Sequence, residues 1–401
     1  MLTDTLIEAA RALAPETIAL RRAIHAEPEL GLHCPLTMTK VRDALVDLPL
    51  AWRTGPSTTG AVATLTGAKA GENSPRVLLR GDMDALPMDE KTGLEFASTI
   101  PGRMHACGHD THTAMLAGAA RVLAERRETL AGTVDFMFQP GEEGHHGARF
   151  MLDDGLIDPL PDAAFALHIM PNAKFGVLAG RAGALMAAAD QFTITVKGKG
   201  GHASMPHDCA DPVPAAAAIV SAVQAMVTRR FNAANAVVVT VTRLQAGTAF
   251  NVIPDDAILQ GTIRTLSPEN RTKVHTALAQ TATDTARAHG VEADCEIVQG
   301  FPVTICDERA VQLGAKVARA LSGGDGWHDL PAPIMGAEDF SYLLEKVPGA
   351  MFFLGVAPEG DNWSQCCAIH SPRMHVDEAA LPRGVAMLAG CALEFIANGF
   401  E

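Results

Sequence analysis

The first half of the chain alternates short apolar runs with longer segments of helical periodicity. Four apolar runs end in polar or glycine-containing turns, as buried strands do: residues 60–67, 75–84, 132–143 and 162–170. Residues 1–30 and 110–130 instead repeat apolar positions every three to four residues, which is typical of amphipathic helices. Near-continuous apolar strands between helices predict an α/β fold whose mostly parallel sheet is flanked by helices.

The pattern changes near residue 186, where strictly alternating segments begin. Residues 191–200 place apolar side chains at every second position, and residues 211–230 have the character of a helix. Two strands, a helix with Ser267 as its N-cap and a last strand follow in order: residues 236–247, 256–265, 267–290 and 291–300. The order β-α-β-β-α-β predicts a ferredoxin-like α+β module.

Two domains are therefore expected. A chain of 401 residues is too long for one compact core. We expect a discontinuous first domain of residues 1–185 and 300–401, with the α+β module of residues 186–299 inserted into it. Beyond residue 300 the chain resumes its alternation with a helix, a strand and a last helix: residues 307–321, a segment from Met351, and residues 378–398.

Composition and charge exclude several classes of protein. The formal net charge is −14 and Lys and Arg are not clustered, which argues against nucleic-acid binding. No run approaches the roughly 20 apolar residues of a membrane span. The first 30 residues lack the basic start and cleavage site of a secretory leader. Eight unevenly spaced cysteines suit reduced thiols better than a disulfide framework, so we expect a cytoplasmic protein.

Polar residues gather where the predicted parallel strands end. Asp82 and Asp84 close one strand, Glu142 and Glu143 follow another, and His168 lies at the end of a third. Ligands of open parallel sheets bind beyond these carboxyl ends. Carboxylates that converge there must share a cation or take up a proton.

The stretch "MHACGHDTH", residues 104–112, adds thiol and imidazole groups. Cys107 and His109 together with carboxylates suit zinc or manganese and disfavour calcium and magnesium. A Cys-x-His spacing is weak by itself, and a buried thiol beside a helix-start histidine is the alternative. If Glu143 binds a metal ion, Glu142 is free to act as a general base; an exposed acidic turn is the alternative for this pair.

Eight motifs are spread over nearly the whole chain, in this order: "RGDMDALPM", "MHACGHDTHTAML", "FQPGEEG", "LHIMP", "GKGGHASMPH", "FNVIPDDAILQGTIR", "MGAEDFSYL" and "IHSPRMHVDE". In these motifs the chain resembles the dinuclear metallohydrolases that include aminoacylases and bacterial carboxypeptidases. It is most similar to their amidohydrolase branch, which holds hippurate hydrolases, N-acyl-amino-acid deacylases and plant auxin-conjugate hydrolases.

The resemblance implies two divalent metal ions per subunit. The implied ligands are Cys107, His109, Glu143, His168 and His370, with Cys107 bridging the two ions. Glu142 would activate the attacking water as general base and later protonate the leaving amine. Asp84 would orient a metal-bound imidazole. Asp82 stands where the peptidase branches have a metal-binding histidine, so we leave it out of the ligand set.

The inserted module would serve as a lid and dimerisation domain. In the family that the chain resembles, the residue matching His202 reaches over the active site of the partner subunit and stabilises the oxyanion. Asn251 would contact the substrate near that oxyanion, Arg264 would pair with a substrate carboxylate, and Gly336 belongs to a predicted pocket wall. A surface position is the alternative for Asn251 and Arg264. A homodimer, or an assembly of dimers, is expected.

The predicted function is metal-dependent hydrolysis of the amide bond of N-acyl-amino acids, which releases a carboxylic acid and an amino acid. A dipeptidase or aminopeptidase of the same architecture is one alternative, against which Cys107 at the bridging position argues mildly. A protein that binds acyl-amino acids or peptides without cleaving them is the other. The preferred acyl group, the preferred amino acid and the native metal stay open.

Overall fold

The computed structural model describes residues 2–322, 326–357 and 367–400, and the side chains from residue 5 onward. It divides the chain into two compact units. Unit 1 comprises Met1–Leu185, Ile305–Ala332 and Asp339–Glu401, and unit 2 comprises Met186–Thr304 and Pro333–Glu338. Unit 2 therefore includes Gly336, which lies far from the rest of that unit in sequence.

Unit 1 is built on an eight-stranded sheet of order β1-β2-β4-β3-β5-β16-β6-β15. In that order the strands are Ala51–Thr54, Ala61–Thr66, Thr133–Gln139, Arg76–Asp82, Ala163–Met170, Gly349–Gly355, Leu178–Gly180 and Trp327–Asp329. The four central strands run parallel, whereas β2 is antiparallel to β4 and β6 is antiparallel to β16. The predicted α/β class is confirmed, with antiparallel pairs on both sides of a parallel centre.

Helices flank this sheet. They are α1 Leu2–Ala12, α2 Ala14–His25, α3 Pro35–Ala44, α4 His109–Ala124, α5 Gly147–Asp153, α8 Glu308–Ser322, α9 Ser341–Leu344 and α10 Leu381–Asn398. Among the described residues one helical stretch, residues 378–398, is long and apolar enough to cross a bilayer. Because 78% of its apolar 18-residue window is buried, and because α10 contacts α1, α4 and α8, it serves as a core helix.

The N-terminal segment departs from the prediction of one long helix. It forms α1 and α2, which are separated at Leu13. Pro15 lies in the first turn of α2, where its missing N–H is no loss. In the interior of a continuous helix the same ring would clash with the carbonyl group four residues earlier. The prediction of a single helix was wrong for a reason that the sequence already contains.

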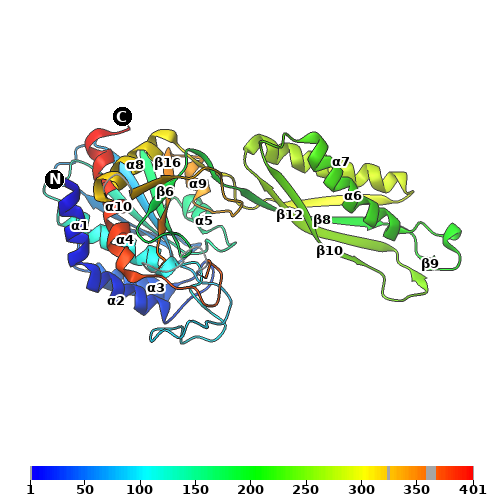
Figure 1. Cartoon of the computed structure of the whole chain (residues 1–401), viewed down its shortest axis with the longest axis horizontal. Coiled ribbons are helices and arrows are strands. Elements are labelled where there is room, and N and C mark those ends of the chain that lie inside the picture. The colour runs from blue at the N-terminus through cyan, green and yellow to red at the C-terminus, as the bar shows by residue number, and fades with distance from the viewer. Residues whose placement is uncertain (1, 323–325, 358–366, 401) are drawn as a thin grey trace. The chain divides into compact units, whose positions relative to one another are not determined.

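Unit 2 has the predicted ferredoxin-like topology. Its antiparallel sheet has the order β10-β12-β8-β13, and α6 and α7 lie along one face of it in Figure 1. The elements are β8 Ala188–Lys197, α6 Pro212–Arg230, β10 Val237–Ala246, β12 Asp256–Thr265, α7 Pro268–Ala288 and β13 Glu292–Val298. The remaining short strands of the chain are β7 Gly183–Met186, β9 Gly201–His202, β11 Val252–Ile253 and β14 Thr304–Cys306.

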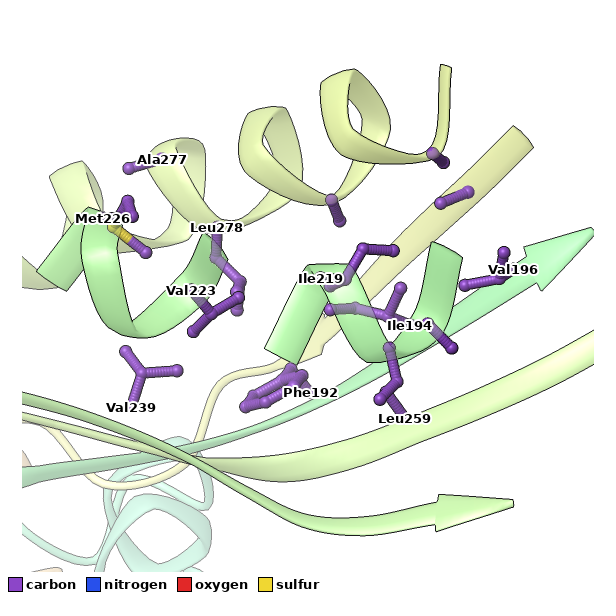
Figure 2. Close-up of a cluster of buried hydrophobic side chains, with 14 of the residues drawn as sticks. Phe192, Ile194, Val196, Ile219, Val223, Met226, Val239, Leu259, Ala277 and Leu278 are labelled. Carbon is purple, nitrogen blue, oxygen red and sulfur yellow. The ribbon is translucent and has the colours of Figure 1, made fainter. Parts of the chain in front are cut away.

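Alternating residues of β8 explain how unit 2 acquires its core. Figure 2 shows Phe192, Ile194 and Val196 pointing from the sheet toward the helices, and all three are buried. Side chains at i and i+2 of a strand share one face, so the period-two pattern places them together. The Ser267 hydroxyl accepts the Asn270 N–H at 3.1 Å and caps α7, as its position predicts.

Candidate metal centre

The ends of three parallel strands bring acids and histidines to one edge of the sheet of unit 1. Strand β3 ends at Asp82, β5 contains His168 near its end, and the loop after β4 carries Glu142 and Glu143. Helix α4 begins at His109. The carboxyl ends of parallel strands lie at the same edge of a sheet. Polar residues at the ends of these strands therefore come together there.

The five predicted metal ligands form connected clusters within unit 1. Within each cluster the ligand atoms all lie within 4.8 Å of one another, and the clusters are Cys107 with His109 and His168, Cys107 with Glu143 and His370, and His109 with Glu142 and Glu143. The Cys107 Sγ lies 3.3 Å from His168 Nε2, and His370 Nε2 lies 3.3 Å from Glu143 Oε1. Cys107, His109 and Glu143 each belong to two of these clusters, so the three clusters adjoin one another.

Backbone geometry brings the Cys107 loop and the distant His370 together. Gly108 has φ +93° and a Cβ there would lie 2.5 Å from an Ile169 side-chain carbon, so only glycine fits between the two ligands of the Cys-x-His pair. His370 also has a left-handed φ, of 64°, which is uncommon for a side chain of this size. Its N–H donates to the Ala106 carbonyl at 2.6 Å, which fixes it beside the loop.

The tautomer of His168 leaves the Nε2 lone pair available to a metal ion. Its Nδ1 lies 2.6 Å from the Ile169 carbonyl oxygen, which only accepts, so Nδ1 carries the proton and donates. The other nitrogen faces Cys107 with its lone pair available. Burial and the neighbouring His112 hold the pKa of His168 well below its usual value. A neutral imidazole is the form that ligates metal.

His109 is the strongest sign that a cation belongs here. Its side chain is 1% exposed, and neither ring nitrogen has a hydrogen-bond partner among the residues that the structure describes. The nearest acidic oxygens are those of Asp84, Asp82 and Glu142, at 3.5, 3.7 and 3.8 Å. Burial lowers the pKa of His109. The opposite effect of Asp82 and Cys107 is larger, so the pKa of His109 lies well above its usual value.

These observations show that the residues fit a metal ion. A buried polar group without a partner costs about 1–3 kcal/mol, which a bound cation would relieve. Thiolate, imidazole and carboxylate together are the ligands of zinc and its first-row neighbours. Glu143 Oε1 likewise has no hydrogen bond among the described residues, although it lies within ion-pair distance of His370.

Asp84 holds the loop that carries the two glutamates. Its Oδ1 accepts the Glu142 N–H at 2.9 Å and its Oδ2 accepts the Glu143 N–H at 3.1 Å. The His109 imidazole lies 3.5 Å from the same carboxylate. The sequence suggested only the contact to an imidazole. The backbone contacts could not be foreseen, because every residue offers an identical N–H.

Both carboxylate oxygens of Asp82 contact other side chains of the protein. The Arg80 guanidinium donates to Oδ2 at 2.5 Å, and His112 Nδ1 lies 2.6 Å from Oδ1. Burial favours the protonated acid, but Arg80 and the imidazoles of His109 and His112 outweigh it and hold the pKa of Asp82 well below its usual range. Asp82 is therefore an ionised partner of fixed groups, and it stays outside the proposed ligand set.

His25 joins a buried network of charges. Its Nδ1 lies 2.8 Å from Asp110 Oδ2 and its Nε2 lies 3.1 Å from Glu90 Oε1. Arg21 donates to Asp110 at 2.7 Å. Burial lowers the pKa of His25, but Asp110 and Glu90 raise it to about 9. The network anchors α2 to the residue next to the candidate ligand His109.

Four predicted site residues lie in unit 2. His202 on β9 pairs with Val252 on β11, and the Ala203 N–H donates to the Asn251 carbonyl at 3.1 Å, so His202 and Asn251 share one small ribbon. Arg264 is half-buried and donates to the Ile263 carbonyl at 3.1 Å. The Gly336 carbonyl accepts the Ala187 N–H at 2.9 Å. The metal-ligand candidates all belong to unit 1.

Residues 78–394 match the model of peptidase family M20/M25/M40. The chain belongs to this family. An IAA-amino acid hydrolase ILR1-like 2 of Arabidopsis thaliana is 37% identical, over 94% of this chain and 85% of the relative. An N-acetylcysteine deacetylase of Bacillus subtilis is 38% identical, over 92% of this chain and 94% of the relative.

Two solved structures share the fold. A putative aminohydrolase from methicillin-resistant Staphylococcus aureus has a TM-score of 0.91 at 28% identity and covers the whole of both chains. The Bacillus subtilis YXEP protein, described as a dinuclear metal-binding peptidase of the M20 family, has a TM-score of 0.84 at 33% identity, over 97% of this chain and 99% of that one. The resemblance read from the motifs is confirmed, and the chain is a metal-dependent amidohydrolase of the M20 family.

Proposed function

We propose that this M20 enzyme hydrolyses the amide bond of N-acyl-amino acids. Water adds to the carbonyl carbon, the C–N bond breaks, and a carboxylic acid and an amino acid are released. The buried Cys107, His109 and Glu142 and the half-buried Glu143 carry the proposal, because they supply metal ligands and a candidate base in one place. The names of two relatives, the IAA-amino acid hydrolase and the N-acetylcysteine deacetylase, support the same substrate class.

Two divalent ions, zinc or manganese, would be held in unit 1. Cys107 would bridge them, and the other ligands would be His109, Glu143, His168 and His370. When bound, such ions polarise a carbonyl oxygen and lower the pKa of water. The chain's own contribution is to hold these ligands rigidly, which the Ile169 contact of His168 and the backbone contact of His370 support.

Glu142 would act as the general base and acid. It is 7% exposed and its Oε2 lies 3.8 Å from His109 Nε2, at the edge of the ligand cluster. It would take a proton from the attacking water and hand it to the amine nitrogen as the C–N bond breaks. Asp84 would keep Glu142 in place through the N–H of that residue.

Unit 2 would serve as the lid and dimerisation domain. His202 would stabilise the oxyanion of the active site in the partner subunit, with Asn251 nearby, and Arg264 would pair with the substrate carboxylate. The segment of Gly336 would line the pocket. The exposure of His202 and Asn251 supports the idea that both are available to a substrate.

A homodimer joined through unit 2 would complete the enzyme. Strand β10 is an edge of the sheet, and exposed apolar side chains lie on it and beyond it, namely Val238, Leu244 and Phe250. Arg243 is the one charged residue of β10, and an edge strand with exposed apolar side chains is a surface prone to pairing. The opposite edge, β13, instead exposes Glu292 and Asp294. A cytoplasmic location is part of the same proposal.

The deciding experiment measures hydrolysis of a panel of substrates before and after removal of metal. N-acetylcysteine, hippurate and an indole-acetyl amino acid represent the proposed class, and unblocked dipeptides represent the peptidase alternative. That alternative is tested because a relative of 35% identity is named thermostable carboxypeptidase 1. We expect turnover of the acyl-amino acids, its loss on chelation and its return with zinc or manganese. Activity that survives complete chelation refutes the metal mechanism, and binding without turnover refutes the enzyme.

A further inference from the structure

His112 has both of its ring nitrogens engaged inside unit 1. Its Nδ1 lies 2.6 Å from Asp82 Oδ1, and its Nε2 accepts the Ile169 N–H at 2.9 Å. The side chain is 2% exposed. A carboxylate only accepts and a backbone N–H only donates, so Nδ1 carries the proton and Nε2 carries the lone pair. With its lone pair used in this way, His112 cannot itself ligate a metal ion.

Ile169 connects His112 to the candidate ligand His168. While the Ile169 N–H donates to His112, the Ile169 carbonyl accepts the Nδ1–H of His168 at 2.6 Å. The two imidazole rings also pack against each other, with centroids 4.5 Å apart. His112 therefore contacts His168 in two ways, through the backbone of Ile169 and through its own ring.

Asp82, at the other end of this arrangement, is itself fixed. Arg80 donates to Asp82 at 2.5 Å, to Gln139 at 2.8 Å and to Asp339 at 3.1 Å. All four residues are at most 2% exposed. A guanidinium fork with three separate acceptors holds the Asp82 carboxylate at a defined place at the end of β3. The series Arg80, Asp82, His112, Ile169 and His168 thus links the interior of the sheet to the metal centre.

We propose that Asp82 and His112 are positioning residues that set the affinity of the centre for its metal ion by fixing the His168 imidazole. The inference rests on the proposed role of His168 as a ligand. Hydrogen-bonded partners behind a metal ligand keep its lone pair aimed at the ion, and their loss typically lowers metal affinity 10- to 100-fold.

Metal affinity of the full-length protein tests this without reference to any substrate. Zinc binding is measured by competition with a chromophoric chelator, and the visible absorption of the cobalt-loaded protein reports the ligand geometry. His112→Phe keeps a ring against His168 but removes both nitrogens, and we expect zinc to bind about 10- to 100-fold more weakly with a changed cobalt spectrum. His275→Asn is the matched control, because it removes a His–Asp contact of 2.7 Å to Asp190 within unit 2.

The outcomes separate this inference from the proposed function. If the wild-type protein binds no zinc, the proposed metal centre is wrong. If it binds zinc and folded His112→Phe binds equally well with the same cobalt spectrum, the positioning role is wrong. Should His112→Phe fail to fold, His112→Asn decides, since its amide can still donate to Asp82 while the acceptor for Ile169 is lost. We expect His112→Asn to weaken zinc binding and the control to leave it unchanged.

Discussion

The Asp84 carboxylate accepts the backbone N–H of Glu142 at 2.9 Å, and its second oxygen accepts the next N–H along the chain at 3.1 Å. Asp84 is 1% exposed, so these contacts lie in the interior of unit 1. The residue therefore sets the course of the loop that carries the proposed base. The contact therefore bears on the position of the proposed base as well as on the shape of the turn.

Asp84→Asn is expected to lower kcat more than it changes KM. An amide presents one acceptor oxygen instead of two, so one of the two N–H groups loses its partner and the loop shifts. A displacement of about 1 Å at a reacting group can cost about 100-fold in rate. Steady-state kinetics with N-acetylcysteine check this, together with zinc content. A variant with unchanged kcat and full zinc would show that the loop does not depend on Asp84.

Glu142→Gln and Glu143→Gln form a matched pair of adjacent isosteric changes. We expect Glu142→Gln to retain metal and to lose about 100- to 10,000-fold in kcat, because an amide cannot accept the proton of water. Glu143→Gln should instead lose metal affinity, because a neutral amide is a poorer ligand than a carboxylate. Metal analysis beside kinetics distinguishes the two. Equal metal loss in both variants would contradict the division of roles.

The clustering of polar residues at the strand ends could be predicted from the sequence, because the carboxyl ends of parallel strands lie at one edge of a sheet. Asp84, Glu142 and His168 each follow a strongly apolar run, and parallel strands bring such positions to one edge. The capping of α7 by Ser267 was equally readable, since a hydroxyl before Pro268 has a local physical meaning. The period-two pattern of β8 defined the core face of unit 2.

Other features had no local signal. His370 was implied by resemblance alone, because its approach to Ala106 depends on a left-handed backbone at a residue type that rarely adopts it. Nor did His112 stand out from His105 within the same stretch. Their difference lies in the Ile169 N–H and in Asp82, and such contacts form only once the strands and α4 have been assembled.

Asp190 makes the stability of unit 2 sensitive to acid. Its carboxylate, 1% exposed, accepts from Arg271, from the Gly300 N–H and from His275. Burial raises its pKa, but the contacts to His275 and Arg271 lower it to about 2. Since the pKa of Asp190 in the folded protein lies below the ordinary aspartate value of 3.8, the unfolded chain binds the proton first. The stabilisation is complete above about pH 4 and is lost as the pH falls toward 2.

Amide hydrogen exchange of β8 and α7 in the full chain tests this claim locally. We expect Asp190→Asn to lose about 1–3 kcal/mol of protection at pH 7, because it weakens several contacts to a buried charge. After correction for intrinsic rates, the difference between wild type and variant should shrink between pH 4 and pH 2. A difference that stays constant over this range would mean that the ionised form of Asp190 contributes nothing.

Whether His202 works on the partner subunit can be decided by mixing two inactive proteins. His202→Ala should fail because its oxyanion contact is missing, and Glu142→Gln should fail because its base is missing. In a mixed dimer, the site with an intact Glu142 would receive His202 of the partner subunit. Random exchange makes half of the dimers mixed, with one complete site each, so up to about a quarter of the wild-type activity should return.

The same mixture tests the alternative arrangement with equal clarity. If His202 served the site of its own chain, every site in a mixed dimer would lack either its histidine or its glutamate, and activity would stay at the level of the separate variants. Leu244→Glu on the edge strand β10 provides the control, because a buried charge there should prevent pairing and yield a monomer by light scattering. Adding this change to both variants should abolish the recovery, since recovery requires subunits that pair.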